Sequence, residues 1–162
     1  MSRKIAGLVA MLTAAAGLVG STLTAYADTS VQGTGSSTIS FVPVVERIAD
    51  GNTFVDYTFT ENLVGIVEGI RIGTGEVVFH PDGTFNTQNT GIFTGTIAGK
   101  SGSAEMDFRG SGTFASAGGN YVVTAGTGGL AGVHAQGTDS GSATGPTSFF
   151  DTNSFKVTFG AP

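Results

Sequence analysis

The sequence predicts an all-β fold, an eight-stranded antiparallel barrel that closes on itself. The chain has 27 Gly among 162 residues, 12 % charged residues and many Val, Thr and Phe, a composition that favours strands and turns over helices. Apolar and polar side chains alternate with a period of two, and no stretch keeps a helical period. With no helix to cover the sheet, closure into a barrel would hide its edges, and a two-sheet sandwich is the alternative.

The first half of the predicted barrel contains four strands separated by turn signals. Pro43 lies within the first, and since proline cannot donate to a strand ladder, we expect a sheet edge or a β-bulge there. Asp50-Gly51-Asn52 and Pro81-Asp82-Gly83 are turn sequences, rich in residues that preset or tolerate turn backbone angles. The third strand is the longest and is expected to bend near Gly73 or Gly75. These strands are predicted at residues 38–48, 53–60, 63–79 and 84–98.

The second half begins after a glycine-rich hairpin at residues 99–102, which leads into the strand with the clearest alternation. The charged side chains of that strand must face water, so its apolar side chains face the interior. The remaining strands are predicted at residues 103–114, 120–127, 133–142 and 148–159. The same parity argument predicts an interior that includes Phe93, Met106, Phe108, Phe155 and Val157.

Four glycines also fall at inward parity: Gly91, Gly95, Gly110 and Gly112. Glycine at such a position either lets the sheet curve or leaves space inside. An eight-stranded barrel is just wide enough to be filled by side chains or to hold one small ligand. The sequence leaves both readings open.

The first 27 residues are predicted to be a signal peptide. Arg3 and Lys4 give it a basic start, an uncharged apolar run covers residues 5–19, and Ala25-Tyr26-Ala27 is a cleavage site of small residues. The apolar run is shorter than the roughly 20 residues of a membrane-spanning helix, which argues against a retained anchor. We therefore expect a secreted or extracytoplasmic protein, with a flexible leader at residues 28–37 and the barrel domain at 38–162.

Charge and residue types exclude several classes of function. After removal of the predicted signal peptide, five basic and twelve acidic residues remain, a net charge of −7. Such a chain, without a basic cluster, is a poor partner for nucleic acid or for anionic membranes. It has no Cys, and its two histidines, His80 and His134, are far apart in sequence, so we expect no metal and no other cofactor.

Glu68 is the main candidate for a functional residue. The residues that share its parity in the predicted third strand are apolar: Val64, Ile66, Ile70 and Ile72. A carboxylate on such a face would be desolvated and its pKa raised, so it could act as a base or an anchor. A slip of parity at Gly65 or Gly69 would instead place it in water. The other ligand-binding candidates, polar side chains predicted to face inward, are Tyr57, Asn89 and Tyr121.

Three glycine-rich segments resemble those of one superfamily. Residues 124–137 (TAGTGGLAGVHAQG) resemble a turn shared by allene oxide cyclases, plant dirigent proteins and a bacterial barrel family of unknown function. Residues 65–69 (GIVEG), and 81–84 followed by 93–103, resemble segments of the bacterial family. The resemblance covers roughly residues 53–142. It implies an allene-oxide-cyclase-like, calycin-like barrel and, by analogy, a homotrimer. It implies no cyclase activity, because the catalytic residues of cyclases and dirigent proteins have no match here.

Two functions from different classes remain in view. The first is a non-enzymatic secreted barrel that holds a small apolar ligand, which fits the absence of any catalytic motif. The second is a cyclase or isomerase acting on an apolar substrate, since a shaped pocket and one base can fold a reactive molecule. An interaction protein using its acidic outer face is a third reading, and the volume of the barrel interior would separate it from the other two.

Overall fold

The computed structural model of the protein describes residues 30–160, so the predicted signal peptide at 1–27 lies outside the described residues. Within them, eight strands follow one another, and no helix is long and apolar enough to cross a membrane. The strands are β1 (Val31–Ala49), β2 (Asn52–Gly65), β3 (Val67–Phe79), β4 (Phe85–Ile97), β5 (Lys100–Gly112), β6 (Ala117–Gly128), β7 (Val133–Gly145) and β8 (Ser148–Phe159).

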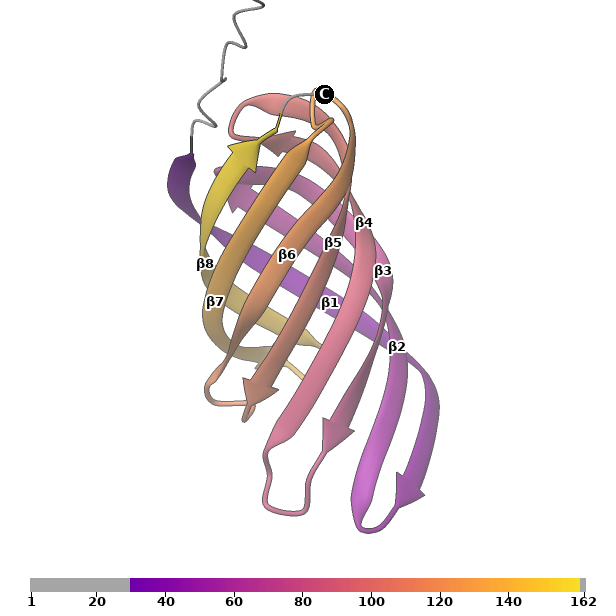
Figure 1. Cartoon of the computed structure of the whole chain (residues 1–162). Coiled ribbons are helices and arrows are strands. Elements are labelled where there is room, and N and C mark those ends of the chain that lie inside the picture. Colours follow the sequence, from indigo (N-terminus) through magenta and orange to yellow (C-terminus); the bar gives the residue numbers. More distant parts are fainter. Residues whose placement is uncertain (1–29, 161–162) are drawn as a thin grey trace, which may run out of the picture.

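The strands form a closed ring. Each strand pairs antiparallel with the next in sequence, and β8 pairs with β1 to complete the barrel (Figure 1). This confirms the predicted all-β class with eight antiparallel strands. The register shifts between Pro43 and Val45 in the β1–β2 pair, which is the bulge that Pro43 predicts.

Two predicted boundaries are wrong. The segment at 31–37, expected to be a flexible leader, is the start of β1 and pairs with β8 from Val31 onward. Its Ser, Thr and Gly residues carry little apolar signal, and closure of the ring supplies the partner that orders them. The predicted third strand also begins too early: residues 63–65 end β2, and the chain turns at Ile66 after Gly65, whose φ is +125°.

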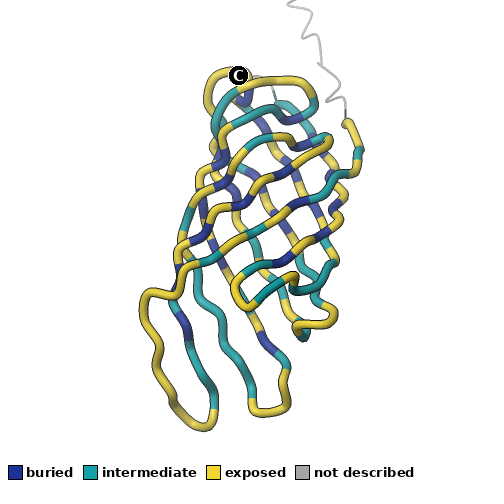
Figure 2. Tube along the Cα trace, turned by 180° about the vertical axis from the view of Figure 1, so that it is seen from behind, coloured by how far each residue is buried: buried dark blue, intermediate teal, exposed yellow. Residues whose placement is uncertain are grey.

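The interior is divided between two ends of the barrel. At the end that holds the β2–β3, β4–β5 and β6–β7 turns, here called the plugged end, Leu130 is 0 % exposed and packs with Val67, Ile97, Val133 and Val157. Buried and exposed residues alternate along the strands (Figure 2). Among the predicted interior residues, Phe93, Met106, Phe155 and Val157 are buried, and Phe108 is half-buried against the same core.

Glycine pairs allow β3 and β4 to approach closely. Gly73 lies directly opposite Gly91, and a Cβ atom added at Gly73 would collide with the backbone oxygen of Thr90. Gly91 is itself in contact range of the Phe59 ring. These inward glycines therefore let the sheet curve. A cavity also lies farther along the barrel, so both expectations for the inward glycines, curvature and interior space, apply.

Candidate functional site

The opposite end of the barrel, here called the open end, contains a cavity. This end holds the β1–β2, β3–β4, β5–β6 and β7–β8 turns, and the cavity has a volume of about 90 Å³. Its walls are aromatic, with neighbouring ring centroids 5.5–6.1 Å apart. These rings belong to Phe41, Tyr57, Phe79, Phe85, Phe114 and Phe149, and Phe108 and Tyr121 also line the cavity. Apolar walls of this kind favour an apolar occupant.

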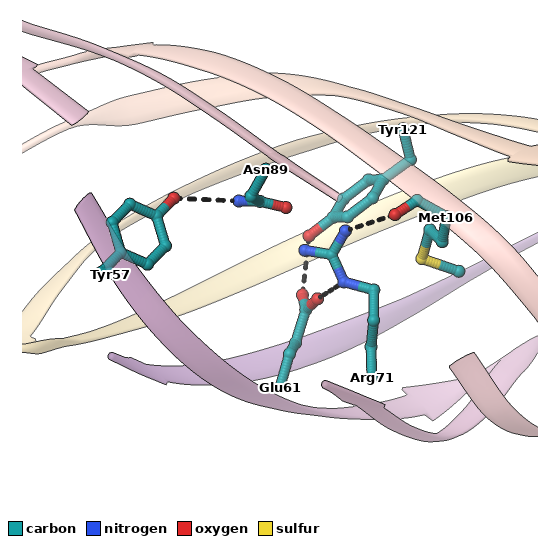
Figure 3. Close-up of polar contacts among 6 residues, drawn as sticks. All are labelled: Tyr57, Glu61, Arg71, Asn89, Met106 and Tyr121. Atoms are coloured by element: carbon teal, nitrogen blue, oxygen red, sulfur yellow. Dashed lines mark hydrogen bonds and ion pairs between the residues drawn. The ribbon is translucent and has the colours of Figure 1, made fainter. Parts of the chain in front are cut away.

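A buried ion pair lies at the inner limit of this cavity. Glu61 of β2 and Arg71 of β3 are opposite residues of the β2–β3 ladder, and both side chains are 0 % exposed. Arg71 Nε donates to Glu61 Oε2 at 2.7 Å, and Arg71 Nη1 donates to the Met106 carbonyl at 3.2 Å. Tyr121 donates its hydroxyl proton to Glu61 Oε1 at 2.7 Å (Figure 3). Burial, followed by the nearby Glu61 charge, raises the pKa of Tyr121 well above its usual value.

The Arg71 guanidinium is also held between two rings. Its central carbon lies 4.6 Å from the centroid of Phe59 and 5.2 Å from that of Tyr121. The aromatic faces and Glu61 together compensate a cation that would otherwise be very costly to bury. The pair is therefore a fixed polar floor beneath the aromatic walls.

Two further carboxyl groups line the cavity from the other side of the ring. Asp139 of β7 and Asp151 of β8 are both cavity-lining residues. Burial, followed by the charge of Glu61, raises the pKa of Asp139 to about 6. Burial, followed by the charge of Asp139, raises the pKa of Asp151 to about 7. Arg71 is the one basic residue among those that line the cavity, so ionising both groups would leave it negatively charged.

These two carboxyl groups predict that lowering the pH from 8 to 5 stabilises the protein. The folded state takes up protons near pH 7 and pH 6, whereas the unfolded chain does so only near pH 4, so stability rises as the pH falls through that window. We expect the free energy of unfolding to increase by about 2 kcal/mol, reduced from the full linkage value by partial solvent access. Urea titrations at pH 8, 6.5 and 5 measure it.

The matched control is the double variant Asp139→Asn/Asp151→Asn, whose stability should change little over the same range. A wild-type stability that falls between pH 8 and pH 5 would contradict the assignment of these carboxyl groups to the interior.

Three of the four sequence candidates lie together in the cavity, and one does not. Tyr57, Asn89 and Tyr121 are buried and line it. The prediction that Glu68 faces the interior is wrong, because its side chain is exposed. The turn at Ile66 starts β3 with Val67 facing inward, so Glu68 faces outward. Three of the four apolar residues of the same parity lie outside with it: Val64, Ile70 and Ile72 are 62, 46 and 60 % exposed, whereas Ile66 is partly buried against the core.

Sequence reasoning missed Glu61 and Arg71, although a signal for Glu61 was present. The inward set of the second strand, Val55, Tyr57 and Phe59, continues with a period of two to Glu61. Because the predicted strand ended at Thr60, Glu61 was not counted among its inward-facing residues. Arg71 was lost by the same parity error that turned Glu68 inward.

Comparison with known proteins gives a likeness of fold. No protein-family model matches the chain, and a search of curated proteins found no match. Among solved structures, the chain is similar to a protein of unknown function from the DUF3224 family of Shewanella oneidensis MR-1. The TM-score is 0.64 at 17 % sequence identity, over 83 % of this chain and all of the other. This neighbour fits the resemblance to a bacterial family of unknown function, and at this identity the likeness shows the fold alone.

Proposed function

We propose that this protein is an exported, non-enzymatic barrel that binds a small apolar ligand at its open end. The observation that carries the proposal is the cavity itself: eight aromatic residues line it, and a fixed polar floor closes it. If side chains filled the barrel interior throughout, as they do at the plugged end, these aromatic residues would surround no cavity. The resemblance to allene oxide cyclases and dirigent proteins stays a prediction, which the barrel topology supports.

The cavity volume sets the size of the ligand. About 90 Å³ is less than the roughly 150 Å³ of an engineered cavity that holds benzene. The mouth is open, however, and Phe114 beside it is 45 % exposed. A ligand of this site would therefore insert one ring or a short chain and leave the rest of its body at the mouth.

We expect toluene to bind in this cavity and a larger side chain at Val77 to prevent it. Val77 of β3 lines the cavity, so Val77→Phe should reduce toluene affinity about tenfold or more by filling the space. Chemical-shift changes in ¹H–¹⁵N NMR spectra, followed as toluene is added, give the dissociation constant.

Val78→Phe is the matched control, because Val78 has the opposite parity and does not line the cavity. Its affinity for toluene should stay within about twofold of the wild type. Toluene shifts that do not saturate, or that respond equally to both variants, would reject the binding site.

Export is the other half of the proposal and rests on residues 1–27. We expect the full-length chain, expressed in a bacterial host, to appear outside the cytoplasm with Asp28 as its first residue. Intact-mass spectrometry of the exported fraction measures this. A product that retains Met1 or the 5–19 segment would refute the proposed signal peptide.

An isomerase or cyclase is a second candidate, and the two interior aspartates favour it. A carboxyl group with its pKa near 7 can both give and accept a proton at neutral pH, as Asp151 would at about 7. The pH titration described above also tests this candidate, because an Asp151 that titrates near 4 could not play that role.

A further inference from the structure

Several polar atoms inside the barrel lack a hydrogen-bond partner. Among the side chains of residues 30–160, the buried atoms without one are Ser37 Oγ, Arg71 Nη2, Asn89 Oδ1, Asp139 Oδ1 and Asn153 Nδ2. Buried polar groups are costly when unpaired, so each such atom calls for a partner. Arg71, Asn89 and Asp139 line the cavity proposed to hold the ligand.

The free oxygen of Asn89 follows from a chain of hydrogen bonds. Thr87 Oγ1 donates to the Glu76 carbonyl at 3.0 Å, so it must accept from the Tyr57 hydroxyl, 2.7 Å away. With its own proton used, the Tyr57 oxygen accepts from Asn89 Nδ2 at 3.2 Å. These linked hydrogen bonds determine which end of the Asn89 amide faces Tyr57, and Oδ1 is left as an acceptor with no donor.

Arg71 supplies the complementary group. Its Nε and Nη1 atoms donate to Glu61 and to the Met106 carbonyl, while Nη2 has no acceptor. The inward positions between Arg71 and Asn89 on β3 and β4 are Gly73 and Gly91, and the Phe59 ring of β2 lies against Gly91 and the Arg71 guanidinium. Figure 3 shows Asn89 between Tyr57 and the group formed by Glu61, Arg71 and Tyr121. One donor and one acceptor without a partner therefore belong to residues that line the cavity.

We propose that the ligand carries a neutral hydroxyl group at its inner end, which accepts from Arg71 Nη2 and donates to Asn89 Oδ1. This rests on the proposed binding function and adds the chemical class of the ligand. A hydroxyl group is both donor and acceptor, so it satisfies both atoms at once. A carboxylate cannot donate to Asn89 and would face Glu61 and Asp139. An ammonium group cannot accept from Arg71.

A series of ligands built on one ring tests this inference. Toluene, benzyl alcohol, benzyl methyl ether, benzoate and benzylammonium share the same apolar part and differ in their polar end. We expect benzyl alcohol to bind about fivefold more tightly than toluene or more, since each new hydrogen bond contributes modestly. The ether, which accepts but cannot donate, should lie below the alcohol, and both ions should bind more weakly than the alcohol. NMR titration gives all five dissociation constants.

The outcomes separate the two proposals. If toluene and benzyl alcohol both fail to bind, the proposed function is wrong. If toluene binds and benzyl alcohol binds no better, water satisfies Arg71 and Asn89 and the hydroxyl inference is overturned. Tightest binding by benzoate or by benzylammonium overturns it as well, because a charge would then decide recognition.

The variant Asn89→Leu gives an independent measurement. It removes the free acceptor, so the ratio of the benzyl alcohol affinity to the toluene affinity should fall to about one. Asn120→Leu, at an exposed position on β6, is the matched control and should keep that advantage. An undiminished preference for the alcohol in Asn89→Leu would overturn the role of Asn89. The ligand series on the wild-type protein decides the inference even if Asn89→Leu fails to fold.

Discussion

Replacing Glu61 with Ala should lower the free energy of unfolding by about 3–5 kcal/mol, because the Arg71 charge would stay buried without its carboxylate. Both side chains are 0 % exposed, so neither charge is in contact with solvent. The variant would also leave the Tyr121 hydroxyl without its acceptor. Urea denaturation followed by circular dichroism measures the loss, and the chain has no Trp, so tyrosine fluorescence gives a second probe.

A matched exposed pair supplies the control for Glu61. Arg47 and Glu76 are also 2.7 Å apart, but their side chains are 50 and 30 % exposed. Glu76→Ala should therefore cost no more than about 1 kcal/mol. The double variant Glu61→Leu/Arg71→Met, which removes both charges, should recover most of the stability lost in Glu61→Ala. A Glu61→Ala cost no larger than that of Glu76→Ala would show that solvent reaches the Glu61–Arg71 pair.

Truncation of Phe93 should have a similarly large effect, a loss of about 3–5 kcal/mol. Phe93 is 0 % exposed, and its ring packs over Gly69 and Gly95, where no side chain could move in to fill the space. Phe93→Ala would thus leave a cavity between β3 and β4. Urea denaturation and thermal melts measure the change.

Thr94→Ala is the control on the same strand, because Thr94 faces outward and is exposed. Its effect should stay within about 0.5 kcal/mol. Equal losses for the two variants would contradict the parity of β4 and, with it, the placement of Asn89 in the cavity.

The period of two was enough to predict eight strands and most of their inward faces. Val55, Tyr57 and Phe59 on one strand, and Phe155 and Val157 on another, alternate with polar neighbours, and all five are buried. This local pattern is reliable because one face of each strand must meet water while the other packs against the core. The same alternation correctly predicted that Tyr57, Asn89 and Tyr121 face inward.

Alternation along a strand does not say which of its two faces points inward, and there the prediction of the site failed. One turn at Ile66 divides the stretch at 63–79, and the inward residues on both sides of it, Leu63 before and Val67 and Arg71 after, have the parity opposite to that of Glu68. Val64, Ile70 and Ile72 look like an interior face in the sequence but lie outside, with Glu68. Hydrophobicity alone cannot identify such a face when the interior itself contains charges.

The sequence by itself determined the fold class, the order of the strands and the aromatic character of the interior, since these depend on local alternation and on turn residues. Only the tertiary structure decided the site. Glu61, Arg71, Tyr121 and the two aspartates come from five different strands. Hydrogen bonds join the first three inside the barrel, and the two aspartates line the cavity near them. Closure of the ring brings them together, and the pairing of β1 with β8 that completes it joins segments more than a hundred residues apart.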